Sequence, residues 1–191
     1  MNPNDLVGIK ILSFGTFAKK KVRGVIMLNE ENGNRCIALI CKEEIVSEMK
    51  HRFDSPDSFS SHPLNALASA LPSQIISEMS IVISDFKDGE YLAVLRYAIE
   101  NTEVRMNAAD AVLLAVACRI PLFAKREFLE RYGIPYVPAS GAIPMPCAVL
   151  PLDILKDIMD EAVQFEDYET AALIRNEIRR REDEESATQK L

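Results

Sequence analysis

The chain of 191 residues is acidic overall, with 22 basic and 29 acidic residues and a formal net charge of −7. Its hydrophobic content of 48% is typical of a globular protein, and its length leaves room for one sizeable domain plus a small appendage. Residues 151–191 hold 6 basic and 12 acidic side chains, and residues 1–150 hold 16 and 17. Neither part has the basic excess of proteins that bind phosphate backbones tightly without a metal or a partner.

No apolar run approaches the roughly 18 residues that a membrane-spanning helix needs. The N-terminal part contains Asn4, Asp5 and the basic run Lys19-Lys20-Lys21, with no apolar core of signal-peptide length. We therefore expect a cytoplasmic protein with no membrane partner.

The four cysteines and two histidines limit the kind of metal site. No pair among Cys36, Cys41, Cys118 and Cys147 has the two-residue spacing of a zinc knuckle or a redox motif. We expect reduced thiols, mostly in the core. Any metal would need carboxylate ligands.

The N-terminal third predicts a meander of strands followed by helices. Strands are expected at residues 6–14, 22–28 and 35–41, with Asn32-Gly33 forming a turn. Apolar residues then recur at helical spacing over residues 42–52. A polar loop over 54–62 leads into a helix that begins at Pro63.

The stretch from Ile81 to Phe123 predicts the centre of the domain. Apolar residues alternate on both sides of Asp88-Gly89, which is typical of a strand hairpin, and a third strand follows. Residues 108–118 are almost entirely apolar and predict a helix that is covered on most sides. A short helix over 125–132 should end at Gly133. The fold class expected is α+β, with a mixed, largely antiparallel sheet and packed helices.

The C-terminal part predicts a separate helical hairpin. Residues 134–150 are rich in proline and should form an extended linker after the domain of residues 1–133. Two amphipathic helices are expected within 151–183, with Asp167 capping the second, and a polar, disordered tail over 184–191.

The central hairpin resembles the bifunctional nuclease (BFN) domain family. The segment Asp85-Phe86-Lys87-Asp88-Gly89 matches the family's hairpin in register, whereas the family's helix-entry segment keeps only the aspartate at Asp110. The resemblance implies an α+β domain, a homodimer, and hydrolysis of DNA or RNA phosphodiester bonds with Mg or Mn as the metal.

The same resemblance gives candidate site residues. Asp110, Asp85, Asp88 and His62 would be catalytic, and the three aspartates would hold the metal, because clustered carboxylates are the usual ligands of these ions. Each residue also has a structural explanation. Asp85 and Asp88 suit a turn, Asp110 suits a helix N-terminus and His62 suits a helix entry.

Residues 159–178 resemble the UVR motif of the nucleotide-excision-repair proteins UvrB and UvrC, through the acid-acid-Tyr-Glu pattern that ends in Tyr168-Glu169 and the Ile174-Arg175 pair. The resemblance implies pairing with a UVR-containing or other protein partner. The residues expected at that interface are Leu155, Met159, Tyr168, Ala172, Arg175 and Ile178. A structural brace on the chain's own domain is the alternative.

Two functions remain open at this point. One is a metal-dependent nuclease with a UVR protein-interaction hairpin. The other is a catalytically inactive BFN-like scaffold whose hairpin binds a DNA-repair or stress-response partner.

Overall fold

The computed structural model describes residues 5–16, 23–33, 35–54, 62–87, 90–135, 150 and 152–188, the last five by their backbone alone. The chain forms two compact units, Met1–Pro144 and Met145–Leu191. We describe each unit by itself.

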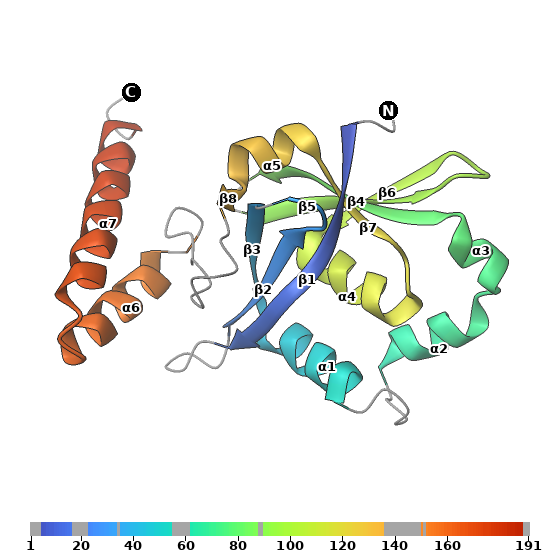
Figure 1. The fold of residues 1–191 in the computed structure, drawn as a ribbon, viewed down its shortest axis with the longest axis horizontal. Helices are drawn as coiled ribbons and strands as arrows, with labels where there is room; N and C mark the ends of the chain where they lie inside the picture. Colours follow the sequence, from blue (N-terminus) through green and yellow to red (C-terminus); the bar gives the residue numbers. More distant parts are fainter. Residues whose placement is uncertain are drawn as a thin grey trace. The chain divides into compact units, whose positions relative to one another are not determined.

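The first unit is built on a mixed, largely antiparallel sheet (Figure 1). Its eight described strands lie in the order β6-β5-β4-β7-β1-β2-β3-β8. The predicted fold class is confirmed. The strand bounds are β1 Leu6–Thr16, β2 Arg23–Glu30, β3 Arg35–Lys42, β4 Met79–Lys87, β5 Glu90–Tyr97, β6 Thr102–Asn107, β7 Leu122–Lys125 and β8 Ile134–Pro135.

The helices after the meander follow the predicted positions. Helix α1 (Glu43–Asp54) begins with Glu43 and Glu44, which favour the positive end of its dipole. Helix α2 (Pro63–Ala70) begins at Pro63 as predicted, and the short α3 (Ser73–Ser77) was not expected. The predicted loop between α1 and α2 lies largely outside the described residues.

Strand β7 was also missed by the sequence analysis, although it lies in the middle of the sheet. It pairs in parallel with β4, where Val82 lies opposite Phe123, and antiparallel with β1. Four residues between a helix and another helix give too short a pattern to distinguish a strand from a connection. The linker prediction missed β8 for the same reason.

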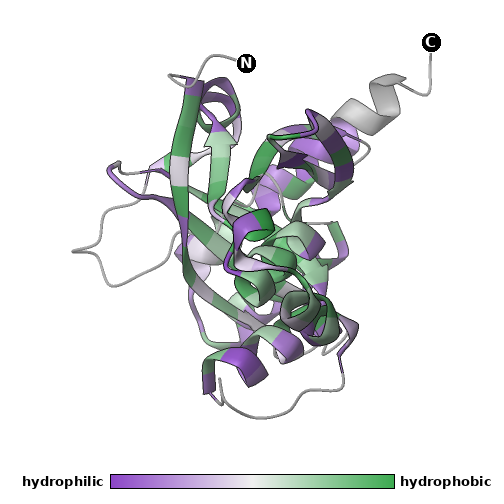
Figure 2. Ribbon diagram, turned by 90° about the vertical axis from the view of Figure 1, so that its right-hand side faces the viewer, coloured by the Kyte–Doolittle hydropathy of each residue, from purple (hydrophilic) through white to green (hydrophobic). Residues whose placement is uncertain are grey.

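Helix α4 (Ala108–Cys118) has the predicted bounds and forms the core. It contacts β3, β4, β5 and β6, and eight of its residues are buried. The Asn107 side chain accepts a hydrogen bond from Ala109 N at 2.8 Å and caps the helix. Figure 2 shows hydrophobic residues concentrated in the middle of the sheet and in the helices packed against it.

Helix α5 (Arg126–Tyr132) closes the end of the sheet through an aromatic cluster. Phe128 and Tyr132 pack on Phe86 and Tyr91, with ring centroids 4.7–6.2 Å apart within the cluster. The helix ends at Gly133 as predicted. Gly133 is extended rather than left-handed, however, and a side chain there would collide with the Leu129 carbonyl.

The second unit is the predicted pair of helices. Helix α6 (Leu152–Gln164) contacts α7 (Tyr168–Thr188), and Asp167 accepts a hydrogen bond from Thr170 N at 3.1 Å as the predicted cap. Hydrogen bonding by the Thr170 side chain, and then by its backbone N–H, lowers the pKa of Asp167. Helix α7 continues to Thr188, where the sequence analysis expected a disordered tail, since a polar composition does not prevent a capped helix from extending.

Within the described ranges, no helix is long and apolar enough to cross a membrane. The thiols of Cys36, Cys41 and Cys118 are free and buried, as predicted, and Cys147 lies outside the described residues.

Candidate functional site: a charged groove on the sheet

The groove lies on the face of the sheet opposite the buried one. On β4 and β5, Ile81, Ile83 and Ala93 point into the core and are fully buried. Their neighbours Val82 and Val94 pair across the two strands and line a groove of about 450 Å³. The alternation of side chains along the strands directs Val82 and Val94 to the groove side, where Val82 forms a buried floor and Ala93 also borders the groove.

A β-bulge brings two consecutive side chains into this groove. The β4–β5 ladder pairs Ile83 with Ala93 and Asp85 with Leu92, so Ser84 is an extra residue. A bulge disrupts strict alternation, and both Ser84 and Asp85 line the groove. One Asp85 carboxylate oxygen accepts a hydrogen bond from Phe86 N at 2.8 Å, and the carboxylate is exposed.

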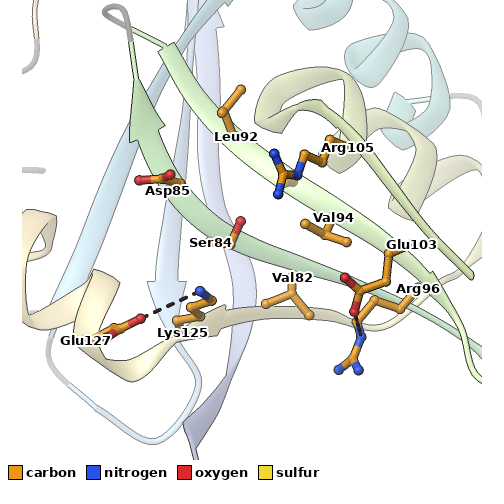
Figure 3. A pocket seen from close by; sticks show the side chains of 11 residues that line it. Val82, Ser84, Asp85, Leu92, Val94, Arg96, Glu103, Arg105, Lys125 and Glu127 are labelled. Carbon is orange, nitrogen blue, oxygen red and sulfur yellow. Dashed lines mark hydrogen bonds and ion pairs between the residues drawn. The ribbon is translucent and has the colours of Figure 1, made fainter. Parts of the chain in front are cut away.

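Charged side chains surround the apolar floor (Figure 3). Arg96 Nε donates to Glu103 at 3.0 Å, and Lys125 Nζ lies 3.6 Å from Glu127 Oε1. No hydrogen bond or ion pair joins Arg105 to the described residues, and Figure 3 shows its guanidinium extending over the strands between Leu92 and Val94. The groove lining therefore carries three cations, Arg96, Arg105 and Lys125, and three carboxylates, Asp85, Glu103 and Glu127.

The predicted catalytic residues are not all at this groove. Asp110 is exposed in the first turn of α4, and it does not line the groove. Burial, followed by the charge of Asp110, raises the pKa of the Cys41 thiol to about 12, which locates Asp110 near the end of β3. Three strands separate β3 from β4 in the sheet.

His62 is at the entry of α2, where its Nδ1 accepts a hydrogen bond from Leu64 N at 3.3 Å. It thus acts as the helix cap, which was the structural alternative. Asp88 lies outside the described residues. Among the residues that the structure describes, no three His, Cys, Asp or Glu side chains form a group able to hold a metal ion.

The family model of the bifunctional nuclease domain matches residues 26–136, which is more than half of the chain. The chain belongs to the bifunctional nuclease domain family. The matched range contains all eleven residues that line the groove. No curated protein matches the chain.

The sequence analysis of this BFN domain missed most of its groove residues. Asp85 was identified from the hairpin, but Ser84, Arg105 and Lys125 were not. Arg105 and Lys125 lie on β6 and β7, and only the strand order and register bring them to the groove that Asp85 also lines. The sequence around an isolated arginine or lysine in a strand does not indicate which residues of other strands lie near it.

The helix pair that follows the BFN domain has its own exposed apolar surface. Of the predicted interface residues, Leu155 and Ile178 are buried, Met159 and Ala172 are half-buried, and Tyr168 and Arg175 are exposed. The large apolar side chains left exposed are Val163, Phe165, Tyr168 and Leu173, with exposed fractions of 50–76%. They surround the turn between the helices and the first part of α7.

Proposed function

We propose that the BFN domain binds a nucleic-acid strand along the groove and hydrolyses a phosphodiester bond there. The observation that carries this proposal is the convergence of Asp85 with Lys125 and Arg105 on one open face of a domain of this family. Cations that stabilise charge on a phosphate, together with a carboxylate that holds an ion or orients water, are a common means of promoting phosphodiester hydrolysis.

Each groove residue has a role that follows from its chemistry. Lys125 and Arg105 bind phosphate oxygens, and Arg105 is suited to this because no described residue occupies its guanidinium. The Ser84 hydroxyl donates to a further phosphate oxygen. Asp85 orients a water molecule or an ion at the scissile phosphate.

A divalent ion fits this arrangement only if phosphate oxygens of the substrate supply some of its ligands. Mg²⁺ is commonly held by one or two carboxylates together with substrate phosphates and several waters. We assign those carboxylates to Asp85 and Asp88, which come from the same hairpin. When bound, Mg²⁺ or Mn²⁺ would polarise the phosphoryl group. In this proposal Asp110 and His62 stabilise the starts of helices α4 and α2 and take no part in cleavage.

The test is cleavage of single-stranded DNA, double-stranded DNA and RNA by the purified full-length chain, with Mg²⁺, Mn²⁺ or chelator. Cleavage should require the ion and should fall at least a hundredfold in Lys125→Met combined with Arg105→Met. The matched control is Arg131→Met, an exposed cation of α5 that does not line the groove. Equal cleavage by the control and the double variant would reject the groove as the site.

A second function is favoured by the exposed side chains of the helix pair. Exposed apolar clusters normally mark interaction sites, and we propose that α6–α7 binds a partner that carries a UVR hairpin, as the resemblance of this segment to that motif implies. In that case the chain serves as a scaffold, whether or not the BFN domain cleaves. The partner can be a protein of DNA repair or of a stress response.

Binding of a purified UVR-containing protein to the chain tests this second proposal. Phe165→Ser combined with Leu173→Ser should weaken binding at least tenfold, because both side chains are more than half exposed and do not support the fold. Asp160→Asn, at an exposed polar position of α6, is the control. Binding that survives removal of residues 151–191 would disprove the proposal.

A further inference from the structure

Among the described strands, β6 forms an edge of the sheet. It is terminal in the strand order, and residues Thr102–Arg105 are exposed. Its sequence Thr-Glu-Val-Arg-Met-Asn contains no proline or lysine, and its register with β5 shows no bulge. Its two charged residues, Glu103 and Arg105, have opposite signs. Val104 is 51% exposed on it.

The backbone groups that β6 leaves unpaired can be identified from the neighbouring strands. Ala98 N donates to Glu78 O, and Ile81 N donates to Pro121 O on the opposite side of β4. Along a strand with antiparallel neighbours on both sides, the backbone N–H and C=O groups of successive residues bond alternately to one neighbouring strand and to the other. Leu95 and Ala93 therefore bond toward β6.

The partners of those residues on β6 are Val104 and Met106. The same alternation then leaves the N–H and C=O groups of Glu103 and Arg105 pointing away from the sheet. These two residues are the ones able to form a new ladder with another strand.

The side chains of β6 select one self-pairing register. When two antiparallel β6 strands are related by a two-fold axis, one residue of each copy lies at the axis and faces its own counterpart. The side chains on either side of that residue must then have compatible charges across the two strands. Centring on Glu103 places two carboxylates opposite each other, and centring on Arg105 places two guanidinium groups together. Centring on Val104 places each Glu103 opposite the other copy's Arg105 and preserves the ladder of outward backbone groups. Opposite charges in cross-strand positions stabilise a sheet, and like charges destabilise it.

We propose that two copies of this chain pair through antiparallel β6 edges, with Val104 on the two-fold axis. Each Glu103 already accepts from Arg96 through Oε1, which leaves Oε2 for the other copy's Arg105. A guanidinium has five N–H donors, so this contact leaves donors directed at the groove.

The pairing has a consequence for the groove. The two-fold axis between these antiparallel strands is perpendicular to the sheet. Rotation about it does not exchange the two faces of the sheet, so equivalent side chains of both copies lie on the same face. The grooves of both copies then open on the same face of one continuous sheet, with the two Arg105 side chains beside the axis. The pairing itself does not depend on whether the groove binds nucleic acid.

Two variants with opposite charge test the register. Arg105→Glu leaves acidic residues at 103 and 105, and Glu103→Arg leaves basic residues at both positions. Each variant alone should dimerise about tenfold or more weakly than the wild type, because both symmetric pairs become repulsive. An equimolar mixture should recover the wild-type dimer as a heterodimer, because every acidic position then faces a basic one. Loss of the exposed Arg96–Glu103 pair has little effect on folding.

The measurement is sedimentation velocity of the full-length chain and of each variant, with circular dichroism to confirm folding. The wild type should sediment as a dimer of the 21.4 kDa chain. A monomeric wild type, or variants that remain dimers when alone, would overturn the proposal.

A covalent trap gives an independent result. Val104→Cys should form a reducible cross-link between copies, since facing residues of a pair without direct hydrogen bonds are about 4.5 Å apart at Cα. Leu173→Cys, an exposed position on α7, is the comparison. If Val104→Cys cross-links no more than Leu173→Cys, the proposed axis is wrong.

Discussion

Lys125 and Glu127 should affect nucleic-acid affinity in opposite directions. Lys125 Nζ lies 3.6 Å from Glu127 Oε1, and the Glu127 side chain is 80% exposed, so this pair contributes little to stability. At a separation of about 4 Å in a water-like dielectric, one pair of unit charges interacts by about 1 kcal/mol. A phosphate bound at Lys125 gains that attraction, and Glu127 opposes it from further away.

These distances give the expected changes. Lys125→Gln should lower the affinity for a single-stranded oligonucleotide about fivefold, from the loss of about 1 kcal/mol. Glu127→Gln should raise it about twofold at low salt, because the opposing carboxylate is lost. Both effects should shrink as salt increases, and Lys125→Gln should reduce the slope of log K against log salt by about 0.7.

Fluorescence anisotropy of a labelled oligonucleotide measures both affinities, with all proteins carrying Asp85→Asn to prevent cleavage. The control is Glu130→Gln, an exposed acid of α5 outside the groove. Equal affinities for the two variants, or changes in the same direction, would refute phosphate binding at Lys125.

Three further predictions concern the elements that hold the site. Asn107→Ala should lower the free energy of unfolding by about 1 kcal/mol, measured by urea denaturation, because the cap of α4 is lost, whereas Asn107→Asp retains the acceptor and should change it little. Deletion of Ser84 should leave the chain folded, since the pairs on both sides of the bulge keep their register, but it should weaken oligonucleotide binding; a chain that fails to fold would disprove this view of the bulge. Hydrogen bonds from Arg180, and then from Arg181, lower the pKa of Glu177 from 4.5 to about 2, so its stabilising effect is present above pH 4.5 and is lost as the pH falls toward 2. Thermal melts of Glu177→Gln should lack this part of the acid dependence, and melts that match the wild type across this range would contradict it.

The sequence was sufficient for the elements whose patterns are long. In the alternating segments around the β4–β5 hairpin and in the continuous apolar run of α4, the local pattern alone indicates which side chains are buried. Both elements were predicted with nearly correct bounds. Asp167 and Pro63 likewise act through local chemistry, which does not depend on the rest of the fold. The four-residue strand β7 lies at the centre of the sheet only because β4 and β1 pair with it, and no local pattern records that.

The groove was less predictable for the same physical reason. Asp85 was found because it belongs to a recognisable hairpin, whereas Arg105 and Lys125 reach the same groove only through the strand order. Ser84 enters the groove because of a bulge, and one extra residue in a strand leaves no distinct mark in its composition. Asp110 was grouped with Asp85 from the family pattern, but it lies near Cys41 and does not line the groove.

The central claim is that phosphodiester cleavage occurs at the groove and depends on Asp85. Single-turnover cleavage by Asp85→Asn and by Asp110→Asn, in the same buffer with Mg²⁺ or Mn²⁺, tests it most directly. Both are isosteric changes at exposed carboxylates, so both variants should fold. We expect at least a hundredfold loss for Asp85→Asn and near wild-type cleavage for Asp110→Asn. Loss of cleavage in Asp110→Asn with activity retained in Asp85→Asn would contradict it and place the chemistry at the head of α4.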